Sequence, residues 1–308
     1  MNRRPSPDCG EGLLHSGIGG ESFRDQVRAR ARRLFCDAMS DTDLVRETRE
    51  GTIATLHFND PARLNAMTRA MGEAFRRRVG KLAQDDSVRA IVLTGEGRAF
   101  SAGGDLDMLQ DQADRGAAAP GIAWRSIRDD MSTFYRLFLS IRDIPCPTIA
   151  AVNGHAIGAG FCVALACDFR YVASEAKLGL NFTRIGLHPG MGATWTLPRL
   201  VGPALASELL FTSRTIDGAE AGRIGLANRV LPREQVLAEA IASAREIAEN
   251  APQAVRAVKR ALRRTENASI EDQLQFEATE QARNFESSDA QEGIAAVREK
   301  RAPTFRGE

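Results

Sequence analysis

The sequence predicts an α/β fold that ends in a helical region. Short uncharged runs, such as residues 90–93 (AIVL) and 148–152 (TIAAV), are typical of strands buried in a layered sheet. Segments with helical apolar periodicity, such as residues 67–82, lie between the strand candidates. From about Ser207 onward no strand candidate follows. We therefore predict an α/β core over residues 39–206 and a helical region over residues 207–308.

The individual elements are predicted in chain order from local patterns. Residues 51–58 (GTIATLHF) alternate apolar and polar positions and predict a strand, and residues 67–82 predict a helix with Arg and Glu outward. Residues 110–120 (QDQADRGAAAP) predict a mobile loop. Two short apolar runs, 148–152 and 169–173, predict buried strands on either side of an apolar helix.

The C-terminal region contains three predicted helices, over residues 237–250, 252–264 and 270–286. The N-terminal residues 1–38 differ from the rest, since a Gly, Ser and Pro-rich stretch precedes an Arg-rich one. We predict that they are a disordered extension or precede the native start at Met39. Transit peptides are also Arg-rich, but acidic residues within 1–38 argue against one.

Composition excludes several classes of function. The 41 basic and 40 acidic residues give a net charge of +1, so we expect no binding to nucleic acid or to an anionic membrane. The five cysteines form no CxxC pair or His–Cys spacing, which predicts no metal site and a reducing, cytoplasmic location. No apolar run approaches the roughly 18 to 20 residues that span a bilayer.

A glycine-rich turn that leads into an apolar helix is the most informative feature, in residues 153–168 (NGHAIGAGFCVALACD). The first backbone N–H groups of a helix have no intrahelical partner, and the helix dipole adds positive charge there. Such a turn can hold an anion. Alternatively, Gly158 and Gly160 simply permit close packing.

A second glycine-rich turn, in residues 97–106 (GRAFSAGGDL), also precedes a predicted helix, and Asp105 is an N-cap type residue. If the two turns face each other, one N–H from each can bind a single carbonyl oxygen. That geometry stabilises an enolate or a tetrahedral anion.

Several ordered motifs between Leu44 and the C-terminus resemble the crotonase superfamily, the enoyl-CoA hydratase/isomerase family. They are NDPARLNAMT, AFSAGGDL, AVNGHAIGAGFCVALACDFRYVA, LGLNFTRIGLHPGMGATWTLPRLVG and DAQEGIAAVREKRAPTF. The resemblance implies a spiral of ββα units, assembly as trimers or dimers of trimers, and an acyl-CoA thioester substrate with no separate cofactor. It also implies that the N–H groups of Gly104 and Ala159 form the oxyanion hole.

The chain departs from this family at both catalytic glutamates, which correspond to Cys162 and Phe182. The segment near Gly190, where some isomerases carry an acidic residue, has none in this chain. Standard two-glutamate hydration is therefore not expected. His188 is the candidate acid or base, because imidazole titrates near neutral pH, although it can equally be a capping histidine.

Other side chains remain open alternatives for the chemistry. Cys162 is a candidate nucleophile or a packing residue, and Arg184 can pair with a substrate carboxylate or face solvent. The loop and helix expected to line the acyl pocket carry several carboxylates that either point inward or are solvated. They are Asp107, Asp111, Asp114, Asp129 and Asp130.

The resemblance also assigns substrate-binding residues. Arg63, Leu64, Asn65 and Ala66 match the segment that borders CoA, and Arg63 either meets a phosphate or caps a surface turn. The opposite wall and the acyl pocket are expected to include Ala102, Gly103, Asp105, Leu106, Gly158, Cys162 and Phe182, with Trp124 and Phe134 as further candidates. The basic residues Lys259, Arg260, Arg263 and Arg264 either reach the nucleotide or form an exposed helix face.

Two functions remain open at this stage. The first is an enzyme that acts on an acyl-CoA through an enolate held in a backbone oxyanion hole. The second is a catalytically weak acyl-CoA-binding protein with a structural or regulatory role. The identities of residues 162 and 182 separate the two.

Overall fold

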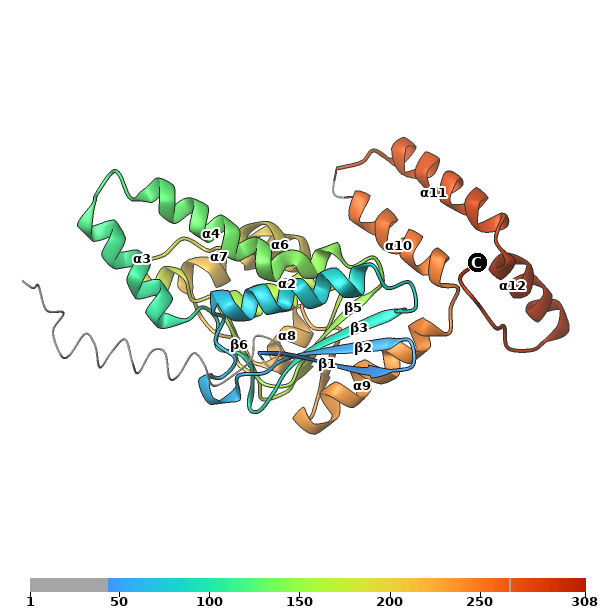
Figure 1. The fold of residues 1–308 in the computed structure, drawn as a ribbon, viewed down its shortest axis with the longest axis horizontal. Helices are drawn as coiled ribbons and strands as arrows, with labels where there is room; N and C mark the ends of the chain where they lie inside the picture. Colours follow the sequence, from blue (N-terminus) through green and yellow to red (C-terminus); the bar gives the residue numbers. More distant parts are fainter. Residues whose placement is uncertain (1–43, 266) are drawn as a thin grey trace, which may run out of the picture. The chain divides into compact units, whose positions relative to one another are not determined.

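The computed structural model describes residues 44–265 and 267–308, so the predictions for residues 1–38 and for the first few residues of the core lie outside it. A six-stranded sheet has the order β1-β2-β3-β5-β7-β9 (Figure 1). β1 pairs with β2 antiparallel, and every other neighbouring pair is parallel. The strands are β1 (Val45–Glu50), β2 (Ile53–Phe58), β3 (Ala90–Gly95), β5 (Thr148–Val152), β7 (Phe169–Ala173) and β9 (Arg229–Leu231).

A second, parallel sheet contains β4 (Ala99–Ser101), β6 (His155–Ile157) and β8 (Leu178–Gly179). The chain alternates between the sheets, because β3, β5 and β7 in the large sheet are followed by β4, β6 and β8 in the small one. A helix follows each pair: α3 (Leu106–Ala118), α5 (Ala159–Ala166) and α6 (Ala193–Val201). The predicted spiral of ββα units is thereby confirmed.

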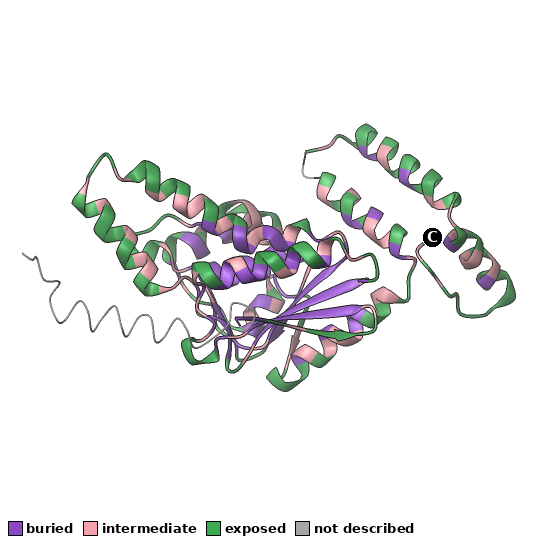
Figure 2. Cartoon of the chain, viewed as in Figure 1, coloured by how far each residue is buried: buried purple, intermediate pink, exposed green. Residues whose placement is uncertain are grey.

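The core lies between the large sheet and the helices that cover it. All residues of β2, β3 and β5 are buried, as Figure 2 shows. α9 (Arg233–Ala248) contacts these strands, while α2 (Arg69–Ala83) packs against α4 (Trp124–Leu139) on the opposite side of the sheet in Figure 1. Four buried aromatic rings, Phe58, Phe75, Phe100 and Phe138, contact one another between these layers.

The C-terminal region follows the short helices α7 (Pro203–Thr212) and α8 (Gly218–Arg223). After α9 it consists of α10 (Pro252–Arg264), α11 (Ile270–Phe285) and α12 (Ser288–Glu299). The bounds of α10 are those predicted, and α11 differs by one residue. Lys259 of α10 ties this region to the core, since its Nζ lies 2.6 Å from Asp168 Oδ2 and donates to the carbonyl of Cys146 at 2.7 Å.

Two predictions of secondary structure were wrong, and one strand was missed. Residues 110–120 are largely helical, because Asp105 caps α3 by accepting a hydrogen bond from the Met108 N–H. β1 was missed since its sequence, VRETRE, is polar and mostly exposed. A strand also occurs beyond residue 207: β9 is only three residues long and is recognisable only by its pairing with β7.

Within the described ranges, every helix is too short or too polar to span a lipid bilayer.

Candidate active site

A cavity of about 340 Å³ lies where the two glycine-rich turns meet α3, α4 and the segment 181–191. Its walls are mostly apolar. They are formed by Ala102, Gly103, Gly104, Leu106, Met108, Leu109, Gln112, Ala113, Ile127, Met131, Phe134, Tyr135, Gly158, Ala159, Asn181, Phe182, Ile185, Leu187, His188 and Met191. Both predicted turns therefore contribute to one cavity.

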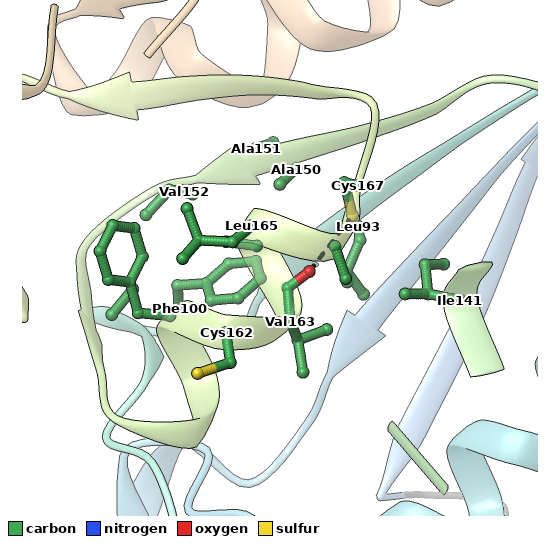
Figure 3. Close-up of a cluster of buried hydrophobic side chains, with 14 of the residues drawn as sticks. Leu93, Phe100, Ile141, Ala150, Ala151, Val152, Cys162, Val163, Leu165 and Cys167 are labelled. Carbon is green, nitrogen blue, oxygen red and sulfur yellow. Dashed lines mark hydrogen bonds between the residues drawn. The ribbon is translucent and has the colours of Figure 1, made fainter. Parts of the chain in front are cut away.

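Gly104 and Ala159, one from each turn, both line this cavity, and each has a backbone N–H group. Neither donates to a protein acceptor in the described part of the chain. Ala159 is the first residue of α5, and every residue of this helix is buried. Figure 3 shows Cys162, Val163 and Leu165 of the helix among Leu93 and Phe100. Because water does not screen the dipole of a buried helix, its N-terminus favours an anion.

The segment after β2 fixes the turn that carries Gly104. The Ala102 N–H donates to the carbonyl of Leu64 at 2.9 Å. The Met67 N–H donates to the carbonyl of Gly103 at 2.7 Å, and the Asp105 N–H returns a bond to the carbonyl of Met67 at 3.2 Å. These bonds flank Gly104 on both sides and hold its N–H in place.

Glycines allow the two turns to approach each other. Gly103 has φ +95°, and a Cβ there would lie 2.6 Å from the carbonyl oxygen of Ile157. Gly158 has φ +51°, which other residues rarely adopt. A Cβ on Gly160 would lie 2.6 Å from that of Ser101, so the packing interpretation is correct for this glycine. Close packing and a free helix N-terminus occur together.

The segment expected to border CoA lies outside the cavity wall. Arg63, Leu64, Asn65 and Ala66 do not line the cavity. Asn65 is fully buried, and its amide donates to the carbonyls of Glu96 and Ala99, both at 2.9 Å, while its Oδ1 accepts from the Asp60 N–H. This side chain is therefore structural, which corrects its expected role as a direct substrate contact.

Arg63 lies at the surface, where ion pairs position it. Its guanidinium is 2.7 Å from Asp60 Oδ2 and 3.6 Å from Asp105 Oδ2. The second pair connects the Arg63 segment with the turn that carries Gly104. The side chain is about half exposed, which leaves donors accessible to a phosphate.

Cys162 does not reach the cavity. It is 2% exposed, and its thiol donates to the carbonyl of Gly190 at 3.7 Å. Burial raises the pKa of this thiol well above its ordinary value. The packing interpretation therefore accounts for Cys162, and its expected contact with substrate is corrected. Phe182 and Phe134 do line the cavity, whereas Trp124 lies outside it, with Arg125 and Arg128 over its ring.

His188 lines the cavity and is exposed. Its Nδ1 lies 2.8 Å from the carbonyl oxygen of Pro189. A carbonyl only accepts hydrogen bonds, so Nδ1 carries the proton in the neutral ring and Nε2 carries a lone pair. In the neutral ring, Nε2 is thus a hydrogen-bond acceptor.

No carboxylate lines this cavity among the residues that the structure describes. Asp130 pairs with Arg115 at 2.6 Å, Asp129 pairs with Arg128, and Asp114 accepts from Gln110. The solvated interpretation holds for these carboxylates. Arg184 is exposed and also lies outside the cavity wall.

Three polar residues of the cavity wall were not predicted: Gln112 of α3, Tyr135 of α4 and Asn181. Nothing in the local sequence marks Gln112 or Asn181. The signal that identifies Tyr135 is the inward face of α4, where Met131, Phe134, Tyr135 and Phe138 follow helical spacing and only Tyr135 carries a polar atom. A further search for His, Cys, Asp and Glu groups able to hold a metal finds none in the described ranges.

Known proteins are similar to this chain in both sequence and fold. The family described as enoyl-CoA hydratase/isomerase matches residues 48–308. The crotonyl-CoA hydratase of Syntrophomonas wolfei is 34% identical over 258 residues, which cover 83% of this chain and 95% of the relative. The mitochondrial enoyl-CoA hydratase domain-containing protein 2 of Bos taurus is 37% identical over 261 residues, 83% of this chain and 85% of its own.

A solved structure extends this similarity to three dimensions. The enoyl-CoA hydratase from Bacillus anthracis has a TM-score of 0.78 and 32% sequence identity, and the match covers 86% of this chain and 100% of the other. The chain therefore belongs to the enoyl-CoA hydratase/isomerase family of enzymes.

Proposed function

We propose that this protein converts an acyl-CoA through a thioester enolate whose oxygen is bound by the N–H groups of Gly104 and Ala159. The observation that supports the proposal is that both residues line one cavity and that neither N–H group donates to a protein acceptor within residues 44–265 and 267–308. Two donors on a thioester oxygen withdraw electron density, so the α-carbon becomes more acidic.

The acid–base groups argue against the two-carboxylate hydration of the family. Cys162 is buried and protonated, and Phe182 presents a ring to the cavity. His188, with its free Nε2, supplies the base, and the apolar walls accept an uncharged acyl chain. Double-bond migration or another reaction of the enolate fits these groups better than the addition of water.

Arg63 is the proposed contact for a phosphate of CoA, because its half-exposed guanidinium is held beside Asp105 at the edge of the turn that carries Gly104. The adjoining backbone of Leu64 and Ala66 would also border the CoA.

The experiment is a panel of acyl-CoA substrates that separates hydration from isomerisation. We expect the protein to convert trans-2- or trans-3-hexenoyl-CoA by double-bond migration and to hydrate crotonyl-CoA poorly. The double variant Cys162→Glu, Phe182→Glu is expected to gain hydration. Efficient hydration by the unaltered protein would contradict the role given to positions 162 and 182. Tight binding of the panel without turnover would favour the acyl-CoA-binding alternative.

We also propose that the C-terminal region mediates assembly into trimers or dimers of trimers. Large apolar side chains are exposed on its helices, among them Leu262, Leu274, Phe285 and Val297. Such residues are typical of surfaces that a partner covers. Light scattering after size-exclusion chromatography is expected to give the mass of three or six chains, and a monomeric mass would exclude this assembly.

A further inference from the structure

The hydroxyl of Tyr135 is a hydrogen-bond donor in the acyl cavity that the chemistry proposed so far does not use. Tyr135 belongs to α4 and lines the cavity. Its hydroxyl donates to no acceptor in the part of the chain that the structure describes. A half-buried hydroxyl in the wall of a mostly apolar cavity can donate a hydrogen bond to a ligand that binds there.

Two neighbours locate this hydroxyl. A Cβ on Gly190 would lie 2.4 Å from the Tyr135 oxygen, so only glycine at 190 leaves room for it. The Cys162 thiol donates to the carbonyl of the same Gly190. The phenol therefore stands beside position 162, where the sequence lacks the family's glutamate.

We propose that Tyr135 is a catalytic residue that donates a proton to the substrate enolate, in place of a carboxylic acid at position 162. In this step the phenol O–H bond breaks as a C–H bond forms at the α-carbon. The electron pair of the enolate forms that bond while the thioester C=O is restored. The phenolate then takes a proton from solvent water. This inference rests on the proposed enolate chemistry.

The environment suits a donor rather than a base. Burial, as the largest cause, raises the pKa of Tyr135 above its ordinary value of 10.0. The phenol therefore keeps its proton at neutral pH, and the enolate carbon is basic enough to take it. His188, with its lone pair on Nε2, and Tyr135, with its proton, line the same cavity and give it a base and an acid.

Tyr135→Phe tests the inference without a change in packing. Because the hydroxyl has no protein partner in the described ranges, the variant is expected to unfold at the same denaturant concentration as the unaltered protein. Hexanoyl-CoA, which cannot isomerise, should bind to the variant with a Kd within about threefold of that for the unaltered protein. The kcat for hexenoyl-CoA should fall by about 10²- to 10⁴-fold with little change in KM.

Tyr171 supplies a matched control, since it is the only other tyrosine of the chain. Its hydroxyl bonds with Ser243 Oγ at 2.9 Å, away from the cavity wall. Tyr171→Phe is expected to lose some stability and to keep its kcat. Gly190→Ala is a second test, because its methyl group would displace the Tyr135 hydroxyl and should lower kcat in a folded protein.

The outcomes separate this inference from the function on which it rests. An active unaltered protein with a Tyr135→Phe variant of equal kcat would overturn the proton donor and leave the enolate chemistry standing. An unaltered protein that binds hexenoyl-CoA but never converts it would overturn both. Loss of stability together with loss of kcat in Tyr135→Phe would assign Tyr135 a structural role and also overturn the inference.

Discussion

Gly103 approaches the carbonyl group of Ile157 so closely that a Cβ at position 103 would lie 2.6 Å from the Ile157 oxygen. One residue belongs to the turn that carries Gly104, and the other immediately precedes the turn that carries Ala159. This contact sets the separation of the two N–H groups on which the proposed oxyanion hole depends. It is a backbone relationship that no side chain can replace.

Gly103→Ala is therefore expected to disturb both stability and activity. A positive φ costs a non-glycine residue about 1–2 kcal/mol, and the clash with a backbone oxygen adds about 1–3 kcal/mol. The free energy of unfolding, measured in urea, should fall by about the sum of these two costs. Gly51→Ala is the control, because Gly51 also has a positive φ, +56°, but open space around its Cβ position. An equal loss in both variants would contradict the importance of the close approach.

Asn65→Ala tests whether Asn65 acts as a structural residue. Its amide satisfies two carbonyls and one N–H in a fully buried position. Leaving such groups unpaired is expected to reduce the free energy of unfolding by about 3 kcal/mol. Asn250→Ala, at an exposed position, should change it little. A stable Asn65→Ala variant that had lost only CoA affinity would instead support direct substrate contact.

Alkaline pH is expected to destabilise the protein through its buried thiols. Burial raises the pKa of Cys146 to about 11 from an ordinary 9.0. The folded state therefore holds this proton more tightly than the unfolded state does. The resulting stabilisation is complete below pH 9 and is lost as pH rises through about 11, by about 3 kcal/mol.

Cys146→Ala isolates this effect, because Cys162 and Cys167 remain in both proteins. The measurement is the free energy of unfolding in urea at several pH values between 7 and 11. We expect the unaltered protein to lose more stability than the variant between pH 9 and 11. Parallel curves for the two proteins would show that Cys146 ionises at the same pH in the folded and the unfolded state.

Local patterns in the sequence predicted much of this architecture. β5, β7 and α10 were recognisable because apolar runs and amphipathic spacing follow directly from burial on two faces or on one. β1 was not, since its Arg and Glu side chains face solvent and only pairing with β2 makes it a strand. The start of α3 was predicted from Asp105, but its continuation through residues 110–118 was missed because its polar sequence buries none of its residues.

The site shows the same division. The Gly104 and Ala159 turns were predicted from their own residues, because free N–H groups are a local property of a helix start. Tyr135 was not, because it reaches the cavity through the packing of α4, and its space depends on Gly190, more than fifty positions away in the chain. The role of Cys162 was likewise decided by burial rather than by its place in a motif.

The most direct test of the account is the turnover of acyl-CoA by Gly104→Pro and Gly104→Ala, each first shown to be folded. Proline removes the N–H donor, whereas alanine keeps it and would meet only Leu109, at 3.7 Å. With a substrate that the unaltered protein converts, we expect Gly104→Pro to lose about 10²- to 10³-fold in kcat and Gly104→Ala far less. A folded Gly104→Pro variant with undiminished kcat would contradict the oxyanion hole.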